Sequence, residues 1–169
     1  AVASVLLGME PETVTGRGAG LSSEGLQKKI QVIRHAIELH HPDPKDPIDV
    51  LAKVGGFDIA GIAGTFLAGA AHHVPVVIDG FISAVAALIA VRLAPDASGY
   101  MLASHVSKEP AAKMLLKELG KEAVLHGEMC LGEGTGAVML FPILDMALAV
   151  YHGMATFEST HIEAYVPLN

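Results

Sequence analysis

The carboxylate with the clearest chemical potential is Glu133, which lies in the segment Leu131-Gly132-Glu133-Gly134-Thr135-Gly136. Three glycines isolate this single acid on a flexible backbone at the expected start of a helix. An apolar setting raises the proton affinity of a carboxylate, as a general base near neutrality requires, whereas the N–H groups of a helix start lower it. Two interpretations of Glu133 therefore stay open, a general base and a helix-capping residue.

A second chemical feature is a loop in which Gly16, Gly18 and Gly20 alternate with other residues ahead of an expected helix. Glycines let a backbone approach an oxyanion closely, and the helix start adds partial positive charge. Lys28 and Lys29 fall on the first turns of that helix, where one of them could reach a bound phosphate. The loop matches neither a Walker A motif nor a complete G-x-G-x-x-G, so an ordinary turn with solvated lysines is the alternative.

A third candidate is Asp79, which directly follows the apolar run Val74–Ile78. A carboxylate is costly there unless it faces a cleft or caps the next helix. Capping and binding of a ribose hydroxyl are both compatible with this position. The lone Cys130 is expected to be buried and inert. Ser104 and Ser107 lack a G-x-S-x-G motif, which gives a hydrolase little support.

The histidines and the overall composition exclude several classes of function. The nine histidines form no H-x-x-x-H, H-E-x-x-H or His/Cys pattern, so we expect no metal site. A net charge of -7 without a Lys/Arg cluster argues against nucleic acid. The apolar stretches Ile59–Ala71 and Phe81–Val91 are shorter than the roughly 18 residues that span a membrane. With one cysteine and no signal peptide, the chain is expected to be cytoplasmic.

The elements that must position these residues follow from hydrophobic patterning. Helices are expected through about His41, over Ile48–Val54 and over Asp58–Ala71. Three short strands, each followed by a helix, are expected after them: Val74–Ile78 with Phe81–Leu93, Tyr100–Ala103 with Ala111–Leu119, and Ala123–Leu125 with Ala137–His152. This alternation predicts the α/β class, a three-layer Rossmann-like parallel sheet flanked by helices.

Residues 1–169 are expected to form a single α/β domain with a helical tail from about residue 153. The opening residues resemble the middle of a helix and lack a start Met, so the chain is expected to be the later part of a longer one. Ligands of open α/β sheets gather at the carboxyl ends of the strands. Asp79, the segment Ser104–Ser107 and Glu133 should therefore share one rim.

Five blocks of the sequence together resemble the nicotinate-nucleotide–dimethylbenzimidazole phosphoribosyltransferases. They occur in the order found in that family and cover nearly the whole chain. The blocks are Val14-Thr15-Gly16-Arg17-Gly18-Ala19-Gly20-Leu21, Asp49-Val50-Leu51-Ala52-Lys53-Val54-Gly55-Gly56-Phe57, Val76-Val77-Ile78-Asp79-Gly80-Phe81-Ile82-Ser83, Ala103-Ser104-His105-Val106-Ser107-Lys108-Glu109-Pro110, and Leu131-Gly132-Glu133-Gly134-Thr135-Gly136.

The resemblance implies transfer of a 5-phosphoribosyl group from nicotinate mononucleotide to 5,6-dimethylbenzimidazole, with inversion at the anomeric carbon and no cofactor. By that likeness Glu133 takes the imidazole proton of the attacking base. The resemblance also implies contacts with the other parts of the substrates. The 5′-phosphate would meet Gly16, Gly18, Gly20 and Lys29, and the ribose would meet Asp79 and Gly80. Ser107 would face the nicotinate end, Leu131 and its neighbours would line the flat base, and Gly136 belongs to the same site.

Family members are about twice as long as this chain and are dimers, so the resemblance also implies a homodimer. Their N-terminal half, which this sequence lacks, contributes to the nucleotide site. Three interpretations of function follow. The first is the phosphoribosyltransferase, the second is a truncated, non-catalytic nucleotide-binding module of the same family, and the third is a generic Rossmann-like dinucleotide enzyme, which the incomplete glycine fingerprint disfavours.

Overall fold

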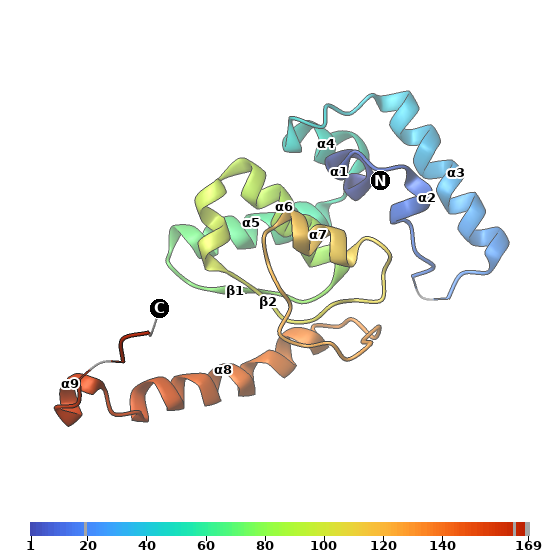
Figure 1. Cartoon of the computed structure of the whole chain (residues 1–169). Coiled ribbons are helices and arrows are strands. Elements are labelled where there is room, and N and C mark those ends of the chain that lie inside the picture. Colours follow the sequence, from blue (N-terminus) through green and yellow to red (C-terminus); the bar gives the residue numbers. More distant parts are fainter. Residues whose placement is uncertain (19, 164, 168–169) are drawn as a thin grey trace.

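The computed structural model describes residues 1–18, 20–163 and 165–167. Figure 1 shows a helical body with one long helix projecting from it. The two strands are β1 (Val76–Ile78) and β2 (Met101–Ala103). The helices are α1 (Val2–Leu7), α2 (Pro11–Val14), α3 (Ser23–His40), α4 (Pro47–Val54), α5 (Phe57–Ala71), α6 (Phe81–Leu93), α7 (Ala112–Glu118), α8 (Thr135–Gly153) and α9 (Phe157–Thr160), with the 3-10 helix η1 (Pro95–Tyr100) before β2.

The sheet is parallel, as predicted, with β1 beside β2 and Val77 in register with Leu102. The third expected strand, Ala123–Leu125, is present only as an isolated parallel bridge between His105 and Leu125. The Leu125 amide donates to the Ser104 carbonyl at 2.8 Å. Val124 beside it is 54% exposed, so little apolar burial holds this segment against the sheet edge.

Helix α6 forms the centre of the core, because every residue from Ala84 to Ala90 in it is buried. Helix α5 packs on α6 and against β1. A Cβ at Gly69 of α5 would lie only 2.8 Å from the Val74 carbonyl oxygen, so a glycine is required for this close approach. Helices α5, α6 and α7 lie on one side of the strands, and α8 lies on the other (Figure 1).

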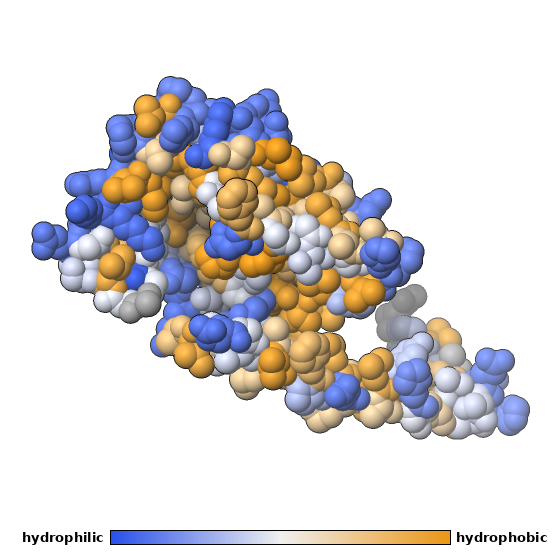
Figure 2. Space-filling model, turned by 180° about the vertical axis from the view of Figure 1, so that it is seen from behind, coloured by the Kyte–Doolittle hydropathy of each residue, from blue (hydrophilic) through white to orange (hydrophobic). Residues whose placement is uncertain are grey.

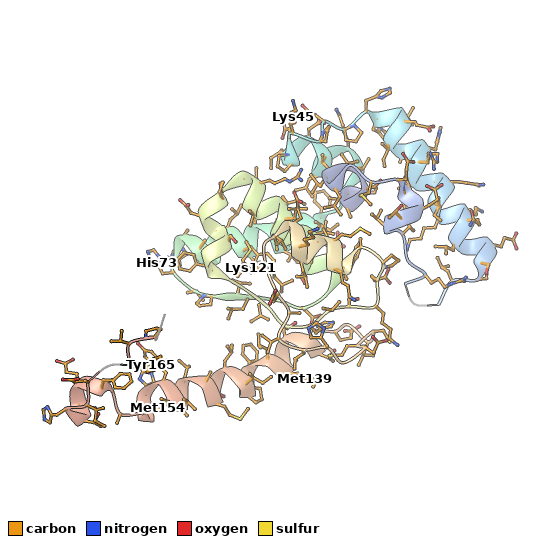
Figure 3. The ribbon with its side chains drawn as sticks, in the orientation of Figure 1. Lys45, His73, Lys121, Met139, Met154 and Tyr165 are labelled. Atoms are coloured by element: carbon orange, nitrogen blue, oxygen red, sulfur yellow. The ribbon has the colours of Figure 1, made fainter. Side chains whose placement is uncertain are left out.

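Helix α8 carries its apolar side chains largely into solvent. Only Gly136 and Leu140 of this helix are buried, and Figure 2 shows hydrophobic surface running along it. Figure 3 labels Met139 in its first turns and Met154 just beyond its last residue. The exposed large apolar side chains of α8 are Val138, Met139, Phe141, Met146, Leu148, Val150 and Tyr151.

Within the described part of the chain, Thr135–Thr160 is also the one helical stretch long and apolar enough to cross a membrane. Only 6% of its apolar window is buried. The two stretches that the sequence singled out as apolar correspond to the shorter helices α5 and α6. Beyond α8 the expected helical tail is wrong for most of its length, since only Phe157–Thr160 is helical among its described residues. Ala164, Leu168 and Asn169 lie outside the described residues.

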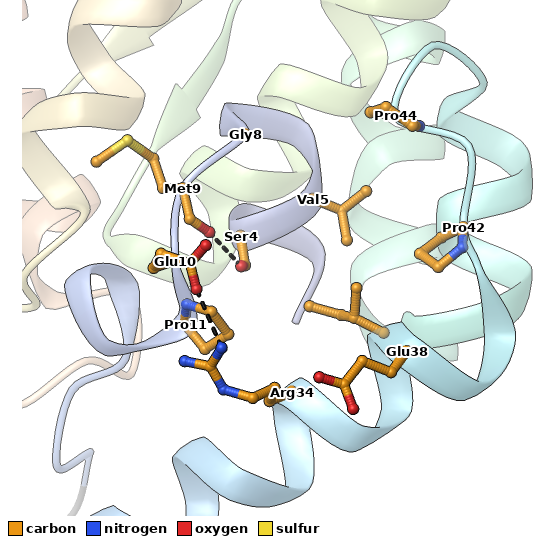
Figure 4. Close-up of a pocket in the computed structure, with 11 residues that line it drawn as sticks. Ser4, Val5, Gly8, Met9, Glu10, Pro11, Arg34, Glu38, Pro42 and Pro44 are labelled. Atoms are coloured by element: carbon orange, nitrogen blue, oxygen red, sulfur yellow. Dashed lines mark hydrogen bonds and ion pairs between the residues drawn. The ribbon is translucent and has the colours of Figure 1, made fainter.

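A small cavity of about 390 Å³ lies between α1, α2 and α3 (Figure 4). Ser4, Glu10 and Arg34 in its wall have hydrogen-bond partners within the protein. The Ser4 hydroxyl donates to the Met9 carbonyl, and the Arg34 guanidinium donates to Glu10 at 3.2 Å and also to Glu12. The Arg34 hydrogen bond holds the pKa of the Glu12 carboxyl below its ordinary value. These contacts fasten α2 to α3, and we regard this cavity as structural.

Candidate functional site

A cavity of about 1150 Å³ opens where the carboxyl ends of β1 and β2 meet the start of α8. The predicted common rim is therefore present, as expected for a parallel sheet. Four loop segments contribute to its walls: the glycine loop before α3, the turn after β1, the loop after β2 and the loop before α8. The predicted residues that line it are Gly16, Gly18, Lys29, Asp79, Gly80, Ser107, Leu131 and Glu133.

The glycine loop is held by side chains of the helix that follows it. The Lys29 ammonium donates to the Gly16 carbonyl oxygen at 3.0 Å. Arg17 bends back, and its guanidinium donates to the Leu21 carbonyl at 2.7 Å. Gly18 and Gly20 have positive φ angles of 56° and 106°, a conformation that glycine adopts without cost. Lys29 is thus at the cavity, as predicted, whereas Gly20 closes the loop outside the lining and Ala19 lies outside the described residues.

Glu109 is a cavity residue that the sequence analysis did not single out. A Cβ on Gly16 would approach the Glu109 carboxyl carbon to 2.7 Å, so the carboxylate packs directly on the glycine loop. The same wall therefore holds a cation, Lys29, and an anion, Glu109. The available signal was the position of Glu109 in the polar loop after β2, where only Ser107 was selected.

Asp79 has a structural role that differs from the expected one. Its Oδ1 accepts a hydrogen bond from the Ala137 amide at 2.9 Å, across 58 residues. It therefore caps α8 rather than the next helix, α6. The start of α6 is served instead by Ser83, whose hydroxyl oxygen accepts from the amides of Asp79 and Gly80 at 2.9 Å each. Because Asp79 also lines the cavity, capping leaves the binding hypothesis open.

Glu133 sits in a run of three left-handed residues. The φ angles of Gly132, Glu133 and Gly134 are 78°, 59° and 75°. A non-glycine residue in this region costs on the order of 1 kcal/mol, and such strain concentrates at functional sites. Gly134 is the N-cap of α8, and the Glu133 carboxylate makes no hydrogen bond within the described residues. The geometry therefore does not support the capping interpretation of Glu133.

The loop before α8 gives the cavity an apolar but open wall. Leu131 lines the cavity and is 74% exposed. Cys130 beside it is exposed as well, so the expectation of a buried cysteine is wrong. Neither residue packs into the core because the left-handed turn at Gly132–Gly134 holds this segment away from it.

His105 is the second cavity residue that the sequence analysis missed. Its side chain is 6% exposed and lies between Gly80 and Gly136. A Cβ on Gly136 would fall within 2.9 Å of the ring Cγ, and still closer to Nδ1 and Cε1. Gly136 is therefore placed behind the site, where it leaves room for His105, and does not line the cavity. The sequence around His105 has no metal-binding spacing, and its role depends on a contact with Gly136 that no local pattern indicates.

No group of three or more His, Cys, Asp or Glu side chains is arranged to hold a metal ion among the residues that the structure describes. The chemistry available at the cavity includes that of the exposed Glu133 carboxylate, the Asp79 carboxylate that caps α8, the paired charges of Lys29 and Glu109 on the glycine loop, and a buried imidazole.

Comparison with known proteins matches this arrangement to one family. A family model described as phosphoribosyltransferase matches residues 1–162. The nicotinate-nucleotide–dimethylbenzimidazole phosphoribosyltransferase of Acetivibrio thermocellus is 52% identical over 167 residues, which are 99% of this chain and 48% of that protein. The same-named enzyme of Escherichia coli K12 is 46% identical over 162 residues, 96% of this chain and 45% of that one.

The structural comparison agrees. The crystal structure of CobT from Thermus thermophilus superposes with a TM-score of 0.87 at 40% identity, over 96% of this chain and 48% of that one. The chain thus spans about half the length of the relatives it matches. The chain matches these relatives in sequence and in fold over nearly all of its own length. It therefore belongs to the phosphoribosyltransferase family.

Proposed function

We propose that this chain carries the base-bearing part of a site that transfers phosphoribose from nicotinate mononucleotide to 5,6-dimethylbenzimidazole. The product is α-ribazole 5′-phosphate, used for the lower ligand of cobalamin. The observation that carries the proposal is the meeting of Glu133 with Lys29 and the glycine loop at one cavity. The names of the relatives give the substrate class.

The proposed reaction needs one base and no acid. The bond from the ribose anomeric carbon to nicotinate breaks, and its electron pair neutralises the positively charged pyridinium nitrogen. A benzimidazole nitrogen forms the new bond on the opposite face, and the proton of the benzimidazole N–H passes to the Glu133 carboxylate. Glu133 suits this role because it is exposed at the cavity and has no hydrogen-bond partner to displace within the described residues.

The remaining residues would hold the mononucleotide. Lys29 and the backbone at Gly16 and Gly18 would bind the 5′-phosphate, since the ammonium already lies against that loop at 3.0 Å from the Gly16 oxygen. Asp79 and Gly80 would border the ribose, and Ser107 the nicotinate end. Leu131 would lie against the flat acceptor. Gly20 would act by shaping the glycine loop, and Gly136 by leaving space for the His105 ring.

The test is nicotinate release when the 169-residue chain is mixed with nicotinate mononucleotide and dimethylbenzimidazole. Glu133→Gln should lower turnover by about 100-fold or more, the scale of a lost general base, with little change in mononucleotide affinity. Glu158→Gln is the matched control, because Glu158 lies on α9 away from the cavity. Unchanged turnover in Glu133→Gln would refute the assignment.

The alternative is a non-catalytic nucleotide-binding module, favoured by the open wall at Leu131. Binding of the mononucleotide without nicotinate release would select it. Cys130 supplies a direct binding assay, because it is the only cysteine, is exposed and lines the cavity. Bound mononucleotide should slow its reaction with a thiol reagent.

We also propose that the chain forms a cytoplasmic homodimer in which the apolar face of α8 packs on a second copy. A helix that is apolar around its circumference is stable when covered, and α8 projects beyond the body that would otherwise cover it (Figure 1). Light scattering at micromolar concentration should give a mass of two chains, and the Val150→Asp variant should give the mass of a single chain. A monomeric mass for the unsubstituted chain would contradict this proposal.

A further inference from the structure

The protonation of His105 can be deduced from its neighbour Ser104, which is fully buried. The Ser104 hydroxyl lies 2.7 Å from the Ile78 carbonyl oxygen and 3.1 Å from the Asp79 carbonyl oxygen. Carbonyl oxygens only accept hydrogen bonds, so the single hydroxyl proton points at one of them. Toward His105 Nδ1, at 3.2 Å, Ser104 can then only accept. The proton of the neutral imidazole is therefore on Nδ1.

This tautomer leaves a lone pair on Nε2. Within the described residues every solvent-inaccessible side-chain nitrogen or oxygen has a hydrogen-bond partner, and Nε2 bonds to none of them, so it must be open to solvent. His105 lines the large cavity, and Nε2 is beside Gly80, 3.8 Å from where a Cβ on that residue would lie. In its neutral form the imidazole thus presents an acceptor at the rim that also carries Asp79.

We infer that His105 is a ligand-binding residue whose Nε2 accepts a hydrogen bond from a ribose hydroxyl. This inference rests on the proposed function for its ligand class. The phosphate and the nicotinate carboxylate of the mononucleotide offer only acceptors at neutral pH, whereas the ribose hydroxyls can donate. An uncharged acceptor therefore matches the sugar. Gly136 leaves the ring the space that a Cβ would otherwise take from it.

The tautomer is tested first, on the free chain at about pH 8, above the usual titration range of imidazoles. Nitrogen-15 NMR of histidine-labelled protein should show His105 protonated at Nδ1 alone. Ser104→Ala removes the oxygen that fixes this state and should give a mixture of the two tautomers. A proton on Nε2 in the unsubstituted chain would overturn the inference, whatever the chain binds.

Binding is tested next by titrating nicotinate mononucleotide, ribose 5-phosphate and nicotinate. His105→Phe keeps a flat ring but removes the acceptor, and it should weaken the two ribose ligands about 3- to 10-fold, the value of one hydrogen bond. Nicotinate affinity should not change. His105→Gln, which returns an acceptor near the Nε2 position, should restore most of the loss. Equal weakening of all three ligands in both variants would indicate a merely structural residue and overturn the inference.

The two proposals fail in different ways. If the unsubstituted chain binds ribose 5-phosphate with the expected dependence on His105 but does not bind nicotinate mononucleotide, the proposed function fails and the role of His105 stands. If the mononucleotide binds and reacts, yet His105→Phe binds it as tightly as the unsubstituted chain, the inference fails alone. If neither ribose ligand binds, both are overturned.

Discussion

The contact between Gly136 and His105 gives the sharpest prediction about this fold. Gly136 is the second residue of α8, and a Cβ there would lie 2.9 Å from the His105 ring Cγ and closer to two further ring atoms. His105 is only 6% exposed, so protein surrounds the ring closely. Gly136→Ala must therefore displace the ring or the start of the helix.

The size of the effect follows from two opposing terms. Overpacking of this kind costs about 1–3 kcal/mol, whereas alanine in a helix gains up to about 1 kcal/mol over glycine. The net loss should be about 1–2 kcal/mol, which corresponds to a fall in Tm of about 2–8 °C for a chain of this size. The control is Gly64→Ala in α5, where a Cβ meets nothing within 4 Å and stability should rise.

A double-mutant cycle read by thermal and urea unfolding isolates this contact. In a His105→Ala background the obstruction is gone, so Gly136→Ala should become neutral or stabilising. The coupling energy should be about 1 kcal/mol or more. If Gly136→Ala destabilises the chain equally in both backgrounds, His105 is not what the glycine accommodates, and the proposed seat of the imidazole is refuted.

Three further predictions concern other contacts. Asp79→Ala removes the cap of α8 and should lower the free energy of unfolding by about 0.5–2 kcal/mol, with faster hydrogen exchange at the Ala137 amide. The control Ser22→Ala, which uncaps α3, should leave exchange at that amide unchanged. Slow exchange at Ala137 in Asp79→Ala would contradict the capping role. Gly69→Ala should destabilise the fold by about 1–3 kcal/mol in urea unfolding. The reason is that its Cβ would lie 2.8 Å from the Val74 carbonyl oxygen, a backbone atom that cannot rotate away. A stabilising result would disprove the close packing of α5 on β1. The third concerns acid. Arg34 lowers the pKa of Glu12 in the folded chain from its ordinary 4.5, so the pair stabilises the fold above that pH and the contribution is lost as pH falls through the lowered value. Glu12→Gln should therefore lower the urea midpoint at about pH 6, and this difference should shrink as the pH is lowered through the acid range. A difference that does not shrink would exclude the ion pair as the cause.

Much of the fold is determined locally and could be predicted. Helices α3, α4 and α5 lie close to their expected bounds, because their apolar periodicity and their stop signals, such as His41-Pro42 and Gly55-Gly56, act within a few residues. The parallel pairing of β1 with β2 follows from the alternation of strand and helix. The third strand and the helical tail are shorter than predicted: Val124 is 54% exposed beside the sheet edge, and beyond α8 only Phe157–Thr160 is helical among the described residues.

The site divides in the same way. The types and spacing of the residues sufficed to place Glu133, Asp79 and Ser107 at one rim, since the carboxyl ends of parallel strands necessarily converge. Only the tertiary structure decided that Asp79 caps α8 from 58 residues away, that Glu109 packs on the glycine loop and that His105 fills the space left by Gly136. These contacts join segments distant in the chain, and their energies depend on a few tenths of an ångström of packing, which no local pattern of residues encodes.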